Sequence, residues 1–393
     1  MQTQPQTTQT PTDSIPNISG EPIPGLENVL LADTRLSRVD GQRGELVIAG
    51  YPLEHIAPYA TFEDMIHLLW TGRRATRAER IALGERLAQS RALPEATLAL
   101  LRGAAEAQRP PMDALRMAAA SLDLGQAQDD DALAFAIVAG LSSLVATFHR
   151  LRQGLEPVAP RQDLDHAAHF LYQLTGDTPR PEAARALATY LNTVVDHGLN
   201  ASTFTARVIT STGSDLLSAV VGAMGALAGP LHGGAPGPAL DMVLDIARPE
   251  RAEPVLREKL ERGERLMGFG HRVYKVRDPR AEVLGQAAEQ LYASGDDPQL
   301  YALTRHVERV AVDLLAEYKP GRRLEANVEL YTALLLHGLG LPNDLFTPVF
   351  AMGRAVGWIA HCHEQRTEGR LIRPRLRYTG AADGRWSRDS LGG

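Results

Sequence analysis

Residues 268–280, GFGHRVYKVRDPR, place one histidine, three arginines and one lysine behind two glycines. The chain as a whole has a formal net charge of −6, so this segment is a local concentration of positive charge. The glycines let the backbone bend closely around His271, and Asp278 with Pro279 is typical of a turn or helix start that positions Arg280. The segment is either a basic surface loop or a site for an anionic ligand.

Arg354 is the second candidate for binding an anion. In the predicted helix FTPVFAMGRAVGWIAH its neighbours one turn away are Phe350, Ala351, Gly357 and Trp358. A guanidinium that leaves from such an apolar face needs an anion, because an unpaired buried charge is costly. The partner is a protein carboxylate or the carboxylate of a ligand, unless the side chain extends to water.

Two further residues could carry acid–base chemistry. His232 follows an apolar helix predicted over residues 216–228 and expected to be buried on all sides. It is a cap, a packed core residue or a catalytic residue. Asn327 is a predicted N-cap that places Glu329 in the first helical turn, where the helix dipole favours its ionised form. Glu329 is therefore either a capping carboxylate or a general base.

The segment HCHE, residues 361–364, contains residue types that bind metals. It lies on a predicted helix, where positions i and i+2 point to opposite sides, so we predict no metal site there. Cys362 is the one cysteine, which excludes a disulfide framework and suits a reducing compartment.

These residues must be positioned by helices for the most part. Hydrophobic residues make up 44% of the chain and aromatic residues only 5%, a composition that favours close helix packing over sheet. An early segment with the turn sequence DGQRG predicts a small β-hairpin, and helical periodicity dominates after it. Thr61 with Asp64 three residues later predicts the start of a helix. A length of 393 residues favours two domains.

Charge and termini limit the possible partners. A pI near 6.1 argues against broad nucleic-acid binding, which leaves a basic surface over much of a domain. The sequence has no run of 18 apolar residues and no secretory signal at its start, so we expect a cytoplasmic protein without a membrane partner. Residues 1–23 are expected to be disordered and residues 381–393 to be flexible.

Several segments together resemble the citrate synthase family. They are GPLHGG, GFGHRVYKVRDPRA, the stretch from NVELYTALLL to GWIAHCHEQ, and RLIRPRLRYTG, in the family's order and spacing. The resemblance extends upstream through VVDHGLNASTFTARVITST and PPMDALR to GLENVLLADTRLSRVDGQRG, and covers roughly residues 24–380. It implies an all-α fold in which a large domain (24–236 and 327–380) and a small domain (237–326) close over the substrates. It also implies a homodimer.

The resemblance implies a reaction and a role for each candidate residue. The family joins the methyl carbon of acetyl-CoA to oxaloacetate and hydrolyses the resulting citryl-CoA. His232 would hydrogen-bond the thioester oxygen, Glu329 would remove the methyl proton, and His271 would bind the ketone and help protonate the alkoxide. The expected oxaloacetate ligands are His197, Arg280, Arg354 and, from the partner subunit, Arg373; the expected CoA ligands are Arg272 and Lys275. No cofactor is implied, because the CoA thioester is a substrate.

Three positions depart from the commonest family pattern. Glu329 stands where most members have aspartate, Pro236 and Gly237 replace an Asn-Glu pair, and Pro111 replaces a histidine. Three functions therefore stay open: citrate synthase, 2-methylcitrate synthase acting on propionyl-CoA, and a catalytically silent protein that binds CoA or dicarboxylates. Because one methylene in an apolar pocket changes binding by only about 1–3 kcal/mol, the first two activities can coexist.

Overall fold

A computed structural model of the chain describes residues 20–26, 29–123, 129–233, 236–271, 273–274, 276–295 and 297–381. Residues 34–372 form one compact unit. The described residues before Thr34 and after Ile372 belong to a second unit, which contains the short helix η1 (Pro24–Leu26) and an ion pair of 2.9 Å between Arg377 and Glu21. The predicted tails lie mostly outside the described residues.

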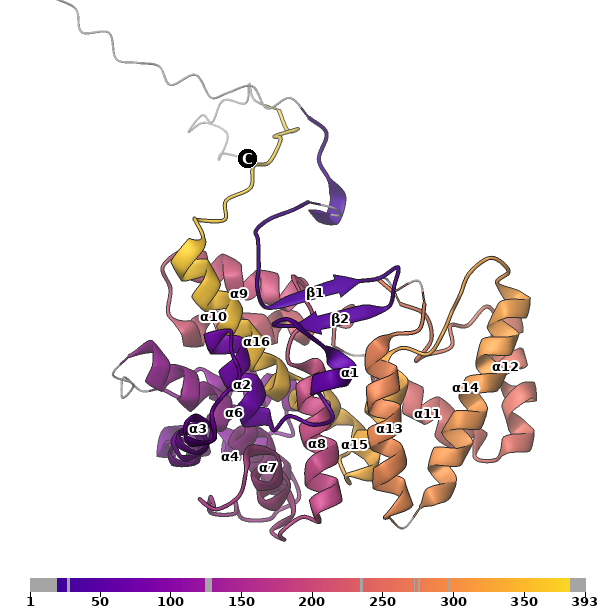
Figure 1. Cartoon of the computed structure of the whole chain (residues 1–393), viewed down its shortest axis with the longest axis horizontal. Helices are drawn as coiled ribbons and strands as arrows, with labels where there is room; N and C mark the ends of the chain where they lie inside the picture. Colours follow the sequence, from indigo (N-terminus) through magenta and orange to yellow (C-terminus); the bar gives the residue numbers. More distant parts are fainter. Residues whose placement is uncertain are drawn as a thin grey trace, which may run out of the picture. The chain divides into compact units, whose positions relative to one another are not determined.

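The compact unit is built almost entirely of helices, as predicted (Figure 1). They are α1 (Leu53–Ile56), α2 (Phe62–Thr71), α3 (Arg77–Gln89), α4 (Glu95–Glu106), α5 (Pro111–Ala119), α6 (Asp130–Arg152), α7 (His166–Thr175), α8 (Pro181–Val194), α9 (Ala201–Ser211), α10 (Leu216–Leu227), α11 (Pro236–Ile246), η2 (Pro249–Arg251), α12 (Ala252–Glu261), α13 (Pro279–Ala293), α14 (Pro298–Tyr318), α15 (Val328–Gly338), η3 (Asn343–Leu345) and α16 (Phe346–Glu368).

The predicted hairpin is present as part of a small antiparallel sheet. Strand β1 (Ser37–Asp40) pairs with β2 (Glu45–Ile48), and β2 pairs with the short β3 (Tyr51–Pro52). The β1–β2 turn is the DGQRG segment, where Gly44 has a φ of 70°, a conformation that favours glycine. Leu46 and Ile48 are buried, so one face of the hairpin packs on the helices.

The predicted helix starts are confirmed where a cap was visible in the sequence. Thr61 and Asp64 form a reciprocal capping box at the start of α2. Asp278 caps α13 immediately before Pro279, and Asn327 caps α15. The last two caps are important for the site, because Arg280 lies in the first turn of α13 and Glu329 lies in the first turn of α15.

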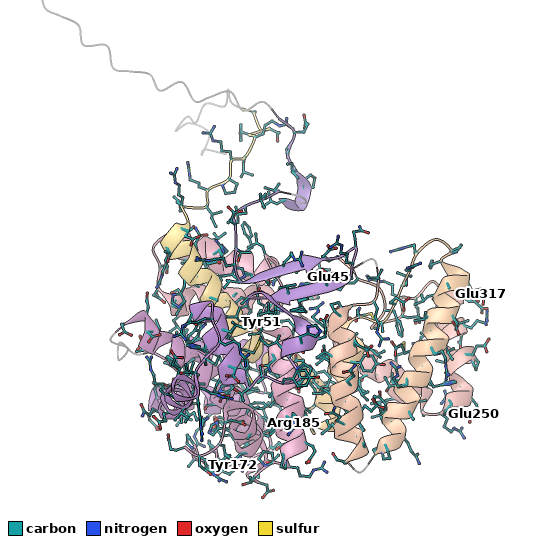
Figure 2. All side chains as sticks on the ribbon, viewed as in Figure 1. Glu45, Tyr51, Tyr172, Arg185, Glu250 and Glu317 are labelled. Atoms are coloured by element: carbon teal, nitrogen blue, oxygen red, sulfur yellow. The ribbon has the colours of Figure 1, made fainter. Side chains whose placement is uncertain are left out.

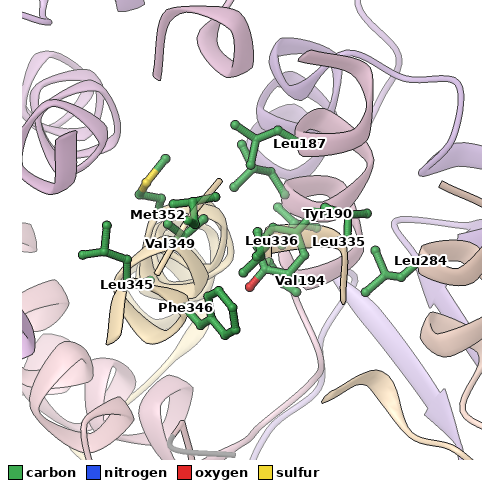
Figure 3. Close-up of a cluster of buried hydrophobic side chains, with 14 of the residues drawn as sticks. Leu187, Tyr190, Val194, Leu284, Leu335, Leu336, Leu345, Phe346, Val349 and Met352 are labelled. Atoms are coloured by element: carbon green, nitrogen blue, oxygen red, sulfur yellow. The ribbon is translucent and has the colours of Figure 1, made fainter. Parts of the chain in front are cut away.

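The helices that lead to the candidate site share one hydrophobic core (Figure 3). α8, α13, α15, η3 and α16 meet there, and their labelled side chains are Leu187, Tyr190, Val194, Leu284, Leu335, Leu336, Leu345, Phe346, Val349 and Met352. A densely packed core holds these helices at fixed spacing. The residues at their ends are therefore held at fixed spacing as well.

α6 is long and apolar enough to cross a membrane by length and composition. However, 83% of its most apolar 18-residue stretch is buried within the protein, as in the core helix of a globular domain.

α10 is less buried than its sequence indicates. The prediction that residues 216–228 are buried on every side is wrong for this single chain. Ser218 is exposed, and Val221, Gly222, Gly225 and Ala226 are partly exposed.

The more polar helices gather at one end of the compact unit. α12 and α14 lie side by side there, and Arg257 on α12 forms an ion pair of 2.8 Å with Glu317 on α14 (Figures 1 and 2). The labelled Glu250 lies at the same end, whereas the labelled Tyr172 lies on α7 with the more apolar helices (Figure 2). The predicted division into domains at residues 237 and 327 stays a prediction.

Candidate active site

The glycines of the GFG segment bring the basic loop against the start of α15. Gly268 and Gly270 have φ values of 86° and 77°, as expected for residues that turn the backbone sharply. The amide of Gly270 donates to the Glu325 carbonyl at 2.8 Å, and the amide of Asn327 donates to the Gly268 carbonyl at 2.9 Å. The Asn327 side chain also donates to the Gly270 carbonyl at 2.9 Å. The segment with His271 is thereby fixed beside the start of α15, whose first turn contains Glu329.

His271 has a defined tautomer. Its Nδ1 accepts hydrogen bonds from the backbone amides of Val273, at 3.0 Å, and Tyr274, at 3.1 Å. A neutral imidazole that accepts at Nδ1 carries its proton on Nε2. That Nε2 lies 3.2 Å from Nη2 of Arg280. Two N–H donors are thus side by side, an arrangement suited to sharing one oxygen acceptor.

Arg280 is buried and held by one carboxylate. Its Nε and Nη2 donate to the two oxygens of Asp278 at 3.0 and 2.7 Å. Burial disfavours the charge of Arg280, but the attraction of Asp278 outweighs this effect, so the pKa of Arg280 is raised. The guanidinium lies 5.8 Å from the ring centre of Tyr274, and the Tyr274 hydroxyl is 3.1 Å from Nε2 of His197. These contacts join the loop before α13 to the turn after α8.

His197 is the point where the separate segments meet. Its ring centre lies 6.0 Å from that of His271 and 5.7 Å from that of Tyr274. Burial lowers its pKa well below 6.5, and the charges of Arg280 and Arg354 lower it further. His197 is therefore a neutral hydrogen-bonding group at pH 7 that lies within the electrostatic influence of both buried arginines.

Arg354 lies in α16 and is buried, with only 2% of its surface exposed. Its Nε donates to the Val194 carbonyl at the end of α8, and its guanidinium carbon lies 4.6 Å from the ring centre of Phe350. Among the described residues no carboxylate forms an ion pair with it, so the salt-bridge and snorkelling alternatives both lack support. Burial lowers its pKa to about 10, and Asp196 opposes this shift. The group still carries its charge at pH 7.

His232 lies in the tight turn that follows α10. Its Nε2 is 2.8 Å from the Ser202 hydroxyl on α9, which also accepts from Nε1 of Trp358 at 3.1 Å. Burial lowers its pKa to about 4, and the charge of Arg354 adds to the effect. Of the alternatives left open by the sequence, a capping role has no support, since α11 begins at Pro236.

Glu329 is partly buried in the first turn of α15, where its amide donates to the Asn327 side chain at 2.9 Å. Burial raises its pKa, although Arg280 and Asn327 act in the opposite direction. The sequence predicted that the helix start would favour the ionised form, and desolvation outweighs that contribution. A carboxylate with a raised pKa is a stronger base than a solvated one.

The compact unit therefore brings most of the candidate residues into one region. The charge of Arg354 lowers the pKa of both His197 and His232. The charge of Arg280 lowers the pKa of His197, Arg354 and Glu329. Three candidates are not placed in this region. Arg373 is exposed and belongs to the second unit, whereas Arg272 and Lys275 lie outside the described residues.

The side chains of the HCHE segment contact other parts of the protein, and within the segment Nδ1 of His361 lies 4.0 Å from Glu364. His361 lies between Asp196, at 3.1 Å from Nε2, and Arg207, at 3.1 Å from Nδ1. Cys362 is buried, and the ring of His363 packs edge-on against Trp70 at 6.4 Å. The described residues contain no cluster of three potential metal ligands.

Sequence reasoning missed three residues that hold the site together: Tyr274, Ser202 and Asp196. Tyr274 is the one aromatic residue within the basic loop after His271, which was a usable signal. Ser202 and Asp196 act through partners more than 150 positions away, Trp358 and His361, and no spacing in the sequence indicates such contacts.

Comparison with known proteins decides the family. Residues 25–375 match the family model described as citrate synthase, C-terminal domain. The chain belongs to the citrate synthase family. A citrate synthase of Haloferax volcanii is 41% identical over 378 residues, covering 93% of this chain and 98% of the relative. A 2-methylcitrate synthase of Mycobacterium tuberculosis is 37% identical, covering 91% of this chain and 90% of the relative.

Solved structures of citrate synthases have the same fold. The crystal structure of citrate synthase from Pyrobaculum aerophilum superposes with a TM-score of 0.85 at 37% identity, covering 98% of this chain and 100% of that one. The predicted family and helical fold are thus confirmed. Citrate synthases are transferases that condense acetyl-CoA with oxaloacetate, and this chain is an enzyme of that class.

Proposed function

We propose that the chain condenses acetyl-CoA with oxaloacetate through the residues of this region and hydrolyses the product to citrate and CoA. One observation supports the proposal most strongly. Arg354 is buried and charged without an ion-pair partner among the described residues, and its charge helps to keep two histidines, His197 and His232, neutral by lowering their pKa values. A ligand carboxylate is the natural partner of such a group, because it accepts a bidentate hydrogen bond.

The first step is removal of a proton from the acetyl methyl group. Glu329 takes the proton while His232 donates a hydrogen bond to the thioester oxygen, so that no free enolate charge develops. The low pKa of His232 supports this role, since the donor must be a neutral imidazole and not an imidazolium. A donor placed in advance at the enolate oxygen contributes on the order of 3–4 kcal/mol of transition-state stabilisation.

The second step forms the carbon–carbon bond. The enolate carbon attacks the ketone carbon of oxaloacetate, the carbon–oxygen double bond opens, and the resulting alkoxide takes the Nε2 proton of His271. The proton that Glu329 removed from the methyl group balances the step, since its release restores both the imidazole and the carboxylate before the next turnover. The Nε2–H of His271 and the adjacent Arg280 N–H support this assignment, because together they form a small site for a developing oxyanion. Water then hydrolyses the thioester of citryl-CoA, which releases citrate and CoA.

The oxaloacetate carboxylates are assigned to Arg354, Arg280 and His197, with Arg373 completing the site from a partner subunit. The partly exposed face of α10, with Val221, Gly222 and Ala226, is apolar and fits a homodimer. Arg373 precedes Pro374, so its backbone is biased towards an extended conformation that suits an arm. Arg272 and Lys275 are assigned to the binding of CoA phosphate. Closure of the large and small domains over the substrates is proposed to exclude water from the site.

Two alternatives and the location of the protein follow from the same features. The 2-methylcitrate synthase relative keeps propionyl-CoA as an alternative substrate. The substitutions at Glu329, Pro111 and Pro236 are the features that favour a silent binding protein, and the retained arginines and histidines argue against it. The burial of α6 inside the helical core argues against a membrane span, and a cytoplasmic location is part of the proposal. That no cofactor, membrane or nucleic acid takes part stays a prediction.

The test is the release of CoA from acetyl-CoA, followed with a thiol reagent in the presence and absence of oxaloacetate. The proposal predicts release that depends on oxaloacetate. CoA release at the same rate without the oxo acid, or no release at all, would contradict it. The ratio of kcat/KM for acetyl-CoA and propionyl-CoA in the same assay decides between the first two activities.

A further inference from the structure

Asp196 is a fully buried carboxylate, at 0% exposure, that the proposed mechanism does not use. It immediately precedes His197. One oxygen lies 3.1 Å from Nε2 of His361, and the other accepts from the Ser37 hydroxyl and, at 3.3 Å, from the amide of Gly198. Asp196 therefore joins strand β1, helix α16 and the turn that bears His197.

The backbone next to Asp196 is fixed against α16 at very close range. Gly357 faces it, and a Cβ atom at Gly357 would lie 2.9 Å from an Asp196 oxygen and would overlap the Val195 carbonyl. Gly353, one turn earlier in α16, faces Leu191 and Val194 at the end of α8. Arg354 lies between these two glycines in the sequence and donates to the carbonyl of Val194. The same few residues thus position both the carboxylate and the guanidinium.

The two buried arginines of the site relate differently to their aspartates. Asp278 binds Arg280 through two hydrogen bonds and occupies its Nε and Nη2. Asp196 forms no ion pair with Arg354 in the described part of the chain, and Nε of Arg354 donates to a backbone carbonyl instead. Arg354 consequently has an opposite charge two residues beyond its carbonyl partner Val194, against the same turn of α16, but no carboxylate on its guanidinium.

We propose that Asp196 is a positioning residue that balances the charge of Arg354 in the empty site and thereby limits how tightly the site binds a dicarboxylate. The inference rests on the proposed function, because it takes Arg354 as a ligand of the oxo acid. Without Asp196 a buried guanidinium would have no compensating charge, which is costly. With Asp196 in place, an incoming carboxylate is attracted by Arg354 and repelled by Asp196.

The two effects predict opposite changes in stability and affinity when the charge is removed. Asp196→Asn should lower the melting temperature of the empty protein. It should also strengthen oxaloacetate binding by roughly threefold to tenfold, because it removes the repulsion between one buried negative charge and the incoming carboxylate. Isothermal titration with oxaloacetate in the absence of acyl-CoA measures the affinity, and thermal melts with and without oxaloacetate measure the stability. If Asp196 only maintained the local structure, Asp196→Asn would weaken oxaloacetate binding instead of strengthening it.

Ser37→Ala is the matched control, since it removes one hydrogen bond to Asp196 and leaves the charge. It should lower the melting temperature without strengthening binding. If Asp196→Asn does not fold, the double variant Asp196→Asn/His361→Gln keeps a neutral hydrogen-bonding pair and should show the same increase in affinity. Unchanged or weaker binding in the folded variant overturns this inference. Failure of the wild-type protein to bind oxaloacetate overturns the proposed function instead.

Discussion

His232 is neutral at pH 7 because burial holds its pKa near 4, and its ring direction depends on one hydroxyl group. That hydroxyl, on Ser202, receives a hydrogen bond from Trp358 and donates to Oδ1 of Asn200 at 2.8 Å. Nε2 of His232 lies equally close, at 2.8 Å, so the single hydroxyl proton can turn to either acceptor. When the proton goes to Nε2 of His232, the imidazole carries its own proton on Nδ1. That nitrogen is then the donor assigned to the thioester oxygen.

Removal of this hydroxyl should impair the chemistry more than the fold. In Ser202→Ala the ring of His232 loses its partner, and we expect kcat to fall by roughly tenfold to hundredfold, as for a misplaced catalytic group. Steady-state kinetics with acetyl-CoA measures the effect. Ser294→Ala, at an exposed serine that follows α13, is the control and should retain wild-type kcat. A wild-type rate in Ser202→Ala would show that His232 is oriented by something else.

Glu329 should be essential for turnover but not for binding. Glu329→Gln removes the base, and we expect kcat to fall by roughly a hundredfold to ten-thousandfold while oxaloacetate still binds. Because the pKa of Glu329 is raised above 4.5 and the base must be deprotonated, kcat should fall as the pH drops through that raised pKa. A pH–rate profile measures this. The exposed Glu317→Gln is the control, and equal loss of activity there would contradict the assignment.

Single residues were predictable where the cause is local. The apolar neighbours of Arg354 in its own helix indicated burial, and Asn327 indicated the cap that places Glu329. The protonation states were not predictable, because they depend on burial by distant elements. The raised pKa of Glu329 is the clearest example, since the local helix start predicted the opposite direction.

At the scale of elements, α16 contributes more side chains to the site and its supporting contacts than the other helices described. It carries Arg354, Trp358 and His361 on the side where Gly353 and Gly357 let the end of α8 approach. The helix itself was predictable from its apolar sequence. The partner of its glycine face was not, because the pairing of α16 with residues 194–196 is a tertiary contact.

A methyl group at this contact should be costly. Gly357→Ala forces the Val195 carbonyl and Asp196 away, and we expect it to lower the free energy of unfolding by about 1–3 kcal/mol, as for overpacking. Gly84→Ala in α3 meets nothing within 4 Å and should raise that free energy by about 0.5–1 kcal/mol. Urea unfolding of both variants measures the difference. Similar stability in the two variants would show that the close approach is not real.

For element boundaries the sequence was sufficient at helix starts with polar caps, such as Thr61 and Asp278. It was insufficient for α10, whose uniformly apolar residues predicted burial on all sides. An apolar side that another subunit covers has the same composition as one that the same chain covers. The partly exposed side of α10 is therefore consistent with the proposed homodimer.

At the scale of the whole molecule, buried histidines should make the fold sensitive to acid. His166 and His169 are fully buried, and both ring nitrogens of each lack a hydrogen-bond partner among the described residues. Burial lowers the pKa of each to about 3, with the charge of Arg91 as a further cause. The unfolded chain binds these protons near pH 6.5, so stability is lost progressively as the pH falls from about 6.5 towards 3.

The slope of this loss is the measurable quantity. Each histidine contributes up to about 1.4 kcal/mol per pH unit to the fall in the free energy of unfolding. His166→Phe should reduce the slope between pH 6 and pH 4.5 in urea unfolding. The exposed His337→Gln should leave the slope unchanged. An unchanged slope in His166→Phe would contradict the assignment to a buried neutral imidazole.

The central claim is that Glu329 and His232 act on the same acyl group, although they lie on separate elements and share no contact among the described residues. A crystal structure with oxaloacetate and an unreactive acetyl-CoA analogue tests this most directly. The account predicts the Glu329 carboxylate within about 3.5 Å of the acyl methyl position and a His232 nitrogen within about 3.2 Å of the carbonyl oxygen. Either side chain turned away from the bound thioester would contradict it.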